Sequence, residues 1–174
     1  MNSALLTYDL LIIAYGNELR RDDGAGLVLA EKLGTMLAAH GIAVHQLAVH
    51  QLLPELALII ANPMLDGVLF VDTVADRAIN KIIFHALTDT VADVALGHHL
   101  SPQTLLLYAA RLYGYCPPAW LAAIPGTDFG HGAGFSPRTA QLLENITPVT
   151  DLLFAAINAS TSTAPVIQSP PVLS

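Results

Sequence analysis

Apolar residues form two kinds of pattern, which alternate from residue 8 to about residue 159. Short, nearly continuous apolar runs bounded by turn residues are typical of buried strands. Five such runs stand at residues 8–16, 42–49, 68–74, 81–87 and 120–124. Apolar residues at helical spacing fill the other segments, at residues 24–40, 54–62, 101–114 and 136–159. The alternation predicts an α/β fold: a three-layer helix–sheet–helix sandwich with a mostly parallel, twisted sheet of about five strands.

Residues that commonly begin and end helices stand at the edges of the helical segments. Serine–proline pairs at residues 101–102 and 136–137 predict two helix starts, because serine caps a helix N-terminus and proline fits its first turn. Gly41 is suited to the left-handed turn that follows the first helix. Pro148 lacks a backbone donor and should kink or split the last helix.

Length and hydropathy indicate one domain and no membrane span. We expect the domain at residues 1–159, and we expect the Ser-, Thr- and Pro-rich residues 160–174 to form a disordered tail. Hydrophobic residues make up 53% of the chain and the mean hydropathy is +0.55. No window reaches the roughly 18 consecutive apolar residues that a membrane span needs. Asp9 interrupts the apolar start, and no basic region precedes it, so a signal peptide is not expected.

The charge balance narrows the choice of partner. The chain has 14 Asp and Glu against 7 Lys and Arg, a net charge of −7. This argues against nucleic acid or an anionic membrane as partner, and it is compatible with a metal site or a basic polypeptide partner. A single cysteine forms no internal disulfide and no zinc cluster, which fits a reducing, cytoplasmic setting.

An acidic loop at residues 16–26 (GNELRRDDGAG) follows the first predicted strand and opens the first predicted helix. It lacks the glycine pattern that cradles phosphates, so a nucleotide-binding domain is a weaker interpretation. Asp22 and Asp23 can act as acidic caps of that helix. Adjacent carboxylates repel and a cap needs only one, so the second is free to bind a cation.

Asp72 and two histidines complete the candidate set. Asp72 lies in an apolar strand, where an ionised carboxylate costs several kcal/mol unless backbone amides or a cation pair with it. His98 and His99 directly precede the helix start at Ser101, and either is a ligand or a structural histidine. Two carboxylates and one imidazole would suit nickel, zinc or a similar divalent ion, which can acidify a bound water.

Further polar residues follow the ends of other predicted strands. His50 and Gln51 either form a simple polar turn or donate hydrogen bonds to a substrate at the edge of the site. Asp128 and His131, in the glycine-rich loop after the fifth strand, are interpreted as solvated. Because ligands bind beyond the carboxyl ends of parallel strands, we expect these loops to converge on one edge of the sheet.

The combination resembles a known family. The segments GNELRRDDGAG (16–26), Val-Asp (71–72) and HHLS (98–101) look like those of the maturation endopeptidases of nickel–iron hydrogenases. The segments HQLLPEL (50–56) and GAGFSP (132–137) resemble the branch that serves bidirectional, soluble hydrogenases. The resemblance covers most of the predicted domain and implies the same three-layer sandwich.

The resemblance implies removal of a C-terminal extension from the hydrogenase large-subunit precursor after nickel insertion. It also implies that Asp23, Asp72 and His98 contact the metal and carry catalysis, with His99 next to the expected ligand. Ala48 stands where some relatives carry a further aspartate, so a catalytic role for that aspartate does not apply here.

We therefore expect nickel carried by the precursor to dock on this site and to make cleavage conditional on metal loading. Two alternatives stay open at this stage. One is a metal-dependent hydrolase of another substrate with its own ion, and the other is a non-catalytic, nickel-sensing chaperone of the precursor.

Overall fold

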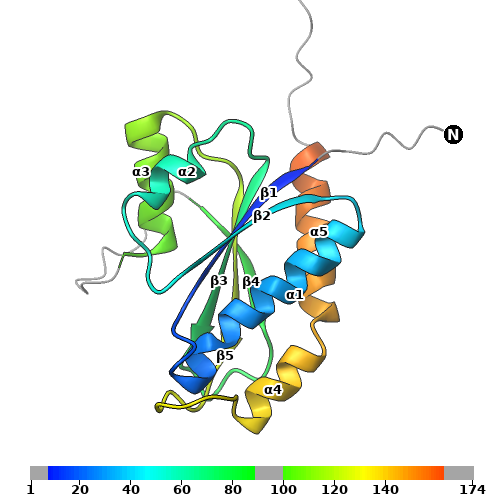
Figure 1. Ribbon diagram of the computed structural model, residues 1–174. Helices are drawn as coiled ribbons and strands as arrows, with labels where there is room; N and C mark the ends of the chain where they lie inside the picture. The colour runs from blue at the N-terminus through cyan, green and yellow to red at the C-terminus, as the bar shows by residue number, and fades with distance from the viewer. Residues whose placement is uncertain (1–7, 89–99, 163–174) are drawn as a thin grey trace, which may run out of the picture.

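A computed structural model describes residues 8–88 and 100–162 (Figure 1). Its centre is a five-stranded sheet in the order β2-β1-β3-β5-β4. The strands are β1 (Asp9–Tyr15), β2 (Ala43–Val49), β3 (Gly67–Val74), β4 (Ile83–Leu87) and β5 (Ala119–Pro125). All neighbours pair in parallel except β4, which is antiparallel to β5 at one edge. The predicted α/β fold with a mostly parallel sheet is confirmed.

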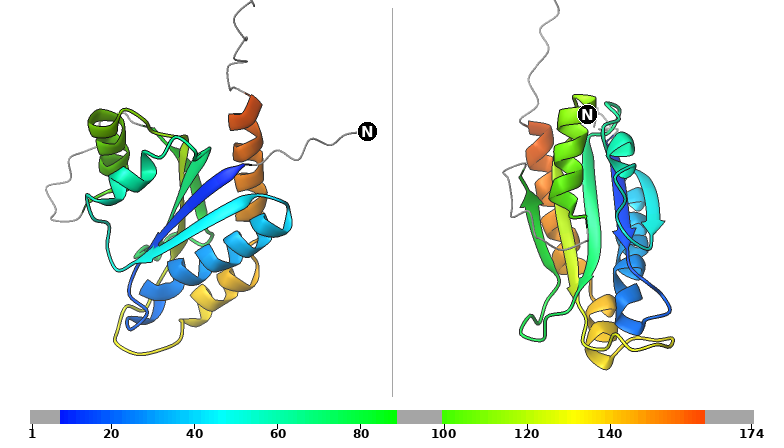
Figure 2. Two further views of the ribbon diagram at one scale, coloured as in Figure 1. Left: turned by 45° about the horizontal axis from the view of Figure 1, so that its top comes forward. Right: turned by 90° about the vertical axis from the view of Figure 1, so that its left-hand side faces the viewer.

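Helices cover both faces of the sheet, as Figures 1 and 2 show. One face carries α1 (Ala25–Ala39), α4 (Pro137–Glu144) and α5 (Thr147–Ser162). The other carries α2 (Leu56–Ile60) and α3 (Pro102–Tyr113). A short 3-10 helix, η1 (Arg21–Gly24), leads into α1. None of the described helices is long and apolar enough to cross a bilayer.

The strand pattern explains two separate apolar cores. Successive strand side chains point to opposite faces. In β1, Leu10 and Ile12 pack toward α1 and α5, whereas Leu11 and Ile13 pack toward α2 and α3. A strand that is buried on both faces has a nearly continuous run of apolar residues. This is why the sequence pattern predicted β1.

The predicted helix ends are mostly confirmed. The Ser101 hydroxyl caps α3 by accepting a hydrogen bond from the Thr104 amide at 3.2 Å. Gly41 follows α1 with a φ of +85°, the left-handed turn that was expected. The last helical segment is split, as the proline predicted, and Pro148 lies in the first turn of α5.

Three elements differ from their predicted bounds by two residues or more. Helix α2 is only five residues long, because residues 54–55 form a turn instead of a helical start and the helix ends at Ile60 instead of residue 62. Strand β4 begins at Ile83, two residues later than expected. Helix α5 continues to Ser162, and the Ser160 hydroxyl within it lies 3.2 Å from the Tyr8 hydroxyl. Residues 163–174 lie outside the described part of the chain, so the disordered tail stays a prediction.

Candidate functional site

The carboxyl ends of the parallel strands bring the candidate residues to one edge of the sheet (Figure 1). The acidic loop follows β1, His50 follows β2, Asp72 lies near the end of β3, and the loop at residues 126–134 follows β5. Since β1, β3 and β5 are direct neighbours in the sheet, their terminal loops lie side by side. We call this edge the acidic rim.

Asp72 and Asp23 form an electrostatically coupled pair at the acidic rim. Burial is the main reason that the pKa of Asp72 is raised to about 6, and the negative charge of Asp23 raises it further. Two hydrogen bonds act in the opposite direction. The Thr73 amide donates to Asp72 Oδ1 at 2.7 Å, and the Tyr15 hydroxyl donates to the same carboxylate. Asp72 is therefore a buried carboxylate with an acidic neighbour, an arrangement that favours binding of a cation.

Tyr15 is a site residue that sequence reasoning missed. The pairing of Ala14 with Val71 places Tyr15, one residue further, beside Asp72 on the α2–α3 face. Burial, followed by the nearby Asp72 charge, raises the pKa of Tyr15 far above its usual value, so it remains a donor. The register between β1 and β3 would have predicted this contact, but that register is known only from the assembled sheet.

The acidic loop is held tightly against the end of β3. The Asn17 amide donates to Asp23 Oδ2 at 3.0 Å. Gly16 has a φ of +151°, and an added Cβ would lie 2.2 Å from the Asp23 carbonyl oxygen, so only glycine fits. The Thr73 hydroxyl accepts from the Gly26 amide at 2.8 Å and lies 3.4 Å from the Asp23 carbonyl oxygen. These contacts fix Asp23 relative to β3.

Close backbone packing also explains the glycine spacing at the start of α1. A Cβ on Gly26 would lie 3.0 Å from the Asp72 carbonyl carbon. A Cβ on Gly24 would lie 3.0 Å from the Glu18 Cα. Both distances are shorter than ordinary van der Waals contact, so the helix reaches the acidic rim only because these positions lack side chains.

Asp22 is fully buried and binds the loop that follows β5. Its carboxylate accepts hydrogen bonds from the amides of Thr127 (2.8 Å), Asp128 (2.9 Å) and Ser136 (2.7 Å). The hydroxyls of Ser136 and Thr139 also donate to it, at 2.7 and 3.1 Å. Burial alone would raise the pKa of Asp22, but these hydrogen bonds, led by those from Ser136, hold it at about 2.

The interpretation of Asp22 as a cap of α1 is wrong. Helix α1 begins at Ala25 with Gly24 in the cap position and no side-chain cap. Ser136 stands at the start of α4 as predicted, but its hydroxyl donates to Asp22 instead of capping a helix amide. No local pattern could reveal this, because the partners lie more than 100 residues apart in sequence.

A second set of contacts joins the same two loops. Arg21 Nη1 lies 2.6 Å from Asp128 Oδ2, and the Arg21 amide donates to the Gly132 carbonyl at 3.2 Å. Arg20 Nε donates to the Phe129 carbonyl at 3.3 Å. Asp128 is therefore an ion-pair partner and not simply solvated. The acidic loop and the glycine-rich loop form one connected structure.

His50 and Gln51 are both exposed at the end of β2. His50 lines a surface hollow of about 420 Å³, together with residues 16–19 of the acidic loop and Leu27. Gln51 does not line this hollow. His131 is exposed, as its solvated interpretation required.

His98 and His99 lie outside the described residues. Within residues 8–88 and 100–162, no three His, Cys, Asp or Glu side chains are arranged to hold a metal ion. The structure thus brings together the two acidic candidates, Asp23 and Asp72. The imidazole ligand stays a prediction.

The fold and this edge define the class: an α/β sandwich with an acidic pair beyond the carboxyl ends of its parallel strands, where such folds bind ligands. The chain matches no protein-family model and no curated protein sequence. Among solved structures, it is similar to the nickel–iron hydrogenase maturation protease HycI from Thermococcus kodakarensis, at 18% identity and a TM-score of 0.60. That match covers 88% of this chain and 94% of the other.

Two further structures carry related names. The hydrogenase maturating endopeptidase HybD from E. coli is 16% identical, with a TM-score of 0.57 over 87% of this chain and 93% of HybD. A hydrogenase 3 maturation protease is 21% identical, with a TM-score of 0.51 over 85% of this chain and 90% of its own. The chain therefore has the fold of the hydrogenase maturation proteases.

Proposed function

We propose that the protein is an endopeptidase that removes the C-terminal extension of a nickel–iron hydrogenase large-subunit precursor. The observation that carries this proposal is the coupled pair Asp23 and Asp72 at the acidic rim. The pair lies in a fold shared with HycI and HybD, which are named as maturation proteases. Peptide-bond hydrolysis is the activity that those names describe.

Nickel enters this proposal as part of the substrate. Asp23 and Asp72 would supply oxygen ligands, and His98, with His99 as its neighbour, would supply a nitrogen ligand. Such a mixed oxygen and nitrogen set suits a divalent ion of the nickel or zinc type. Asp72, whose pKa is raised by burial and by the Asp23 charge, would gain from a nearby cation, because the cation offsets that charge. Nickel already bound in the precursor would meet this need.

This arrangement links cleavage to metal loading. The docked nickel positions the scissile bond beside the acidic rim, or it polarises a carbonyl or a water there. On the protein side, the Thr73 amide and the Tyr15 hydroxyl hold the Asp72 carboxylate in place. The Asn17 amide does the same for Asp23.

The remaining details are also part of the proposal. His50 and Gln51, exposed beside the acidic rim, would contact the substrate. The segments at 50–56 and 132–137 support the branch that serves bidirectional, soluble hydrogenases. We place the reaction in the cytoplasm, because a chain with a single cysteine fits a reducing compartment.

The test is incubation with a nickel-loaded large-subunit precursor, followed by mass spectrometry of the precursor. Asp23→Ala, Asp72→Ala and His98→Ala should each lower the cleavage rate by at least about 100-fold, the usual effect of losing a group that acts in the reaction. Asp151→Ala, an exposed aspartate on α5, is the matched control and should cleave normally. His99→Ala, run in parallel, separates the two histidines.

The other outcomes identify the rival functions. Full activity in all three variants dismisses the site. A precursor that is bound but unchanged in mass identifies a chaperone. Cleavage of short peptides by the protein with its own tightly bound ion identifies a different metal-dependent hydrolase.

A further inference from the structure

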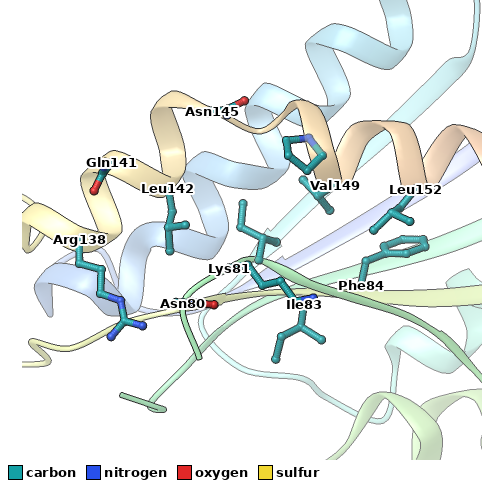
Figure 3. A pocket seen from close by; sticks show the side chains of 12 residues that line it. Asn80, Lys81, Ile83, Phe84, Arg138, Gln141, Leu142, Asn145, Val149 and Leu152 are labelled. Carbon is teal, nitrogen blue, oxygen red and sulfur yellow. The ribbon is translucent and has the colours of Figure 1, made fainter. Parts of the chain in front are cut away.

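A second hollow, of about 690 Å³, lies beside β4 and is lined by neither residue of the acidic pair (Figure 3). Strand β4 is the edge of the sheet and, among the described strands, pairs only with β5. Ile82, Ile83 and Phe84 all line the hollow. Ile82 and Phe84 pack against the core on the α4–α5 side, so the hollow lies on that face of the sheet, beside the edge strand β4. Helices α4 and α5 form its other wall. We call it the edge groove.

The edge groove has a cationic end and an apolar end. Figure 3 shows Arg138 toward one end, Lys81 between the two ends, and Phe84, Val149 and Leu152 toward the other end. The side chain of Leu152 is unusually open for its type, at 50% exposure. Such a surface would gain from covering by another apolar chain.

The charge in the edge groove is opposite to that of the protein as a whole. The net charge is −7, yet among the described residues no acidic side chain lines this groove. Neither Lys81 nor Arg138 forms an ion pair with any carboxylate of the described residues. Arg138 donates to the backbone carbonyls of Arg77, at 2.9 Å, and Ile79. These two hydrogen bonds fix the position of the Arg138 guanidinium, and none of the described carboxylates neutralises its charge. A carboxylate from a bound molecule would supply one.

The edge groove begins close to the acidic rim. Ile83 at the start of β4 pairs with Ala123, which pairs with Asp72 on its other side. Two strand spacings separate Ile83 from Asp72 in the sheet, which is about 10 Å. Because β4 is antiparallel to β5, its first residues, and with them the cationic end, lie toward the acidic rim.

We propose that the edge groove binds the C-terminal extension of the precursor, as an extended peptide with an acidic side chain followed by apolar residues. The identity of the peptide rests on the proposed function. With the scissile bond at the acidic rim, the residues after that bond lead away from it along β4. They would meet Lys81 and Arg138 first and Phe84 and Leu152 afterwards. The outer backbone edge of β4, which no other described strand pairs with, would offer main-chain hydrogen bonds to such a peptide.

Direct binding is the first arm of the test. The probes are fluorescein-labelled peptides with a C-terminal amide, one with two aspartates followed by leucines and valines, the other with asparagines in place of the aspartates. Fluorescence anisotropy should show tighter binding of the aspartate probe. Lys81→Gln should weaken it about fivefold, the upper range for a partly exposed charge pair. Lys32→Gln, the only other lysine and exposed on α1, is the matched control. Equal binding of both probes overturns the proposal.

Cleavage of the nickel-loaded precursor is the second arm. Lys81→Gln and Leu152→Ala should raise KM about fivefold and leave kcat unchanged, because the edge groove contacts no reacting atom. Leu112→Ala, exposed on α3, should leave both constants unchanged. Cleavage with normal KM in both groove variants overturns this inference and leaves the proposed function standing. Failure of the unaltered protein to cleave overturns the proposed function. A dimer that dissociates in the groove variants assigns the groove to a second copy and overturns the inference.

Discussion

Asp22 and Asp72 are two aspartates of one site with opposite pKa shifts. Burial acts on both and favours the protonated form. Asp22 receives backbone and hydroxyl donors that hold its pKa at about 2, whereas Asp72 has fewer donors and a second carboxylate nearby, and its pKa rises to about 6. The number of donors therefore decides the sign of the shift. Asp22 stabilises the fold as an anion, and Asp72 is a strained anion available for a ligand.

At this scale we predict that Asp72→Asn stabilises the metal-free protein at neutral and higher pH. The folded state binds the proton of Asp72 more tightly than the unfolded state, so the charged aspartate costs stability above pH 6 and costs nothing below about pH 4. A shift of about two pH units corresponds to roughly 2–3 kcal/mol. Urea unfolding in chelator at several pH values measures the difference.

The gain from Asp72→Asn should shrink as pH falls from 6 to 4. Asp151→Asn, at an exposed position on α5, should show no such gain. An asparagine variant that is less stable than the wild type at pH 8 would contradict the raised pKa.

At the scale of elements, the acidic rim is built from loops that hold one another. The loop after β1 and the loop after β5 flank the end of β3, because β3 lies between those two strands. Asp22 connects them as a buried acceptor, and Arg21 with Asp128 adds an exposed ion pair. Asp23, next to Asp22 in the chain, is thereby placed against the end of β3. Asp22 therefore supports the structure of the loops, so that its neighbour Asp23 can face a ligand.

We predict that Asp22→Ala destabilises the protein by about 3–5 kcal/mol, the cost of leaving several buried donors without their charged acceptor. Asp128→Ala removes an exposed ion pair and one hydrogen bond from the Gly130 amide, and it should cost much less than Asp22→Ala. Denaturant unfolding at neutral pH compares the two variants. The Asp22 contribution is present above about pH 4 and is lost as pH falls through about 2, since its folded pKa is lowered. Near-equal losses for the two variants would refute the anchoring role.

At the scale of the whole molecule, the proposed function joins two surfaces, the acidic rim for the metal and the edge groove for the extension. The described residues supply two close carboxylates and no three-ligand cluster. We propose that Asp23, Asp72 and His98 alone hold nickel weakly and that the precursor brings the ion. On this proposal, the metal loading of the substrate controls cleavage.

We predict that nickel-loaded precursor is cleaved more than about tenfold faster than the same precursor without nickel. Tenfold corresponds to only about 1.4 kcal/mol, less than a metal with charged ligands commonly contributes. Parallel time courses followed by mass spectrometry measure the ratio. Zinc-loaded precursor serves as the control for ion identity, and equal rates with and without nickel would exclude nickel as the recognition element.

Local patterns in the sequence were sufficient to predict the order and the type of the main helices and strands. Apolar periodicity located the strands and the main helices, because a buried strand or an amphipathic helix must repeat its apolar positions at its own period. The Ser101 cap of α3 and the left-handed Gly41 were predictable for the same reason, since a cap depends on a few adjacent residues. The convergence of Asp23 and Asp72 followed from the topology of parallel strands.

Only the tertiary structure decided which side chains meet across distant segments. Asp22 looked like a helix cap, and its true partners begin at Thr127. The strand register places Tyr15 beside Asp72, and the edge groove forms where α4 and α5 lie beside the edge strand β4. Propensities and periodicities describe near neighbours in the chain. Hydrogen bonds and charge interactions act between residues that are close in space, and only the packing of the chain determines which residues these are.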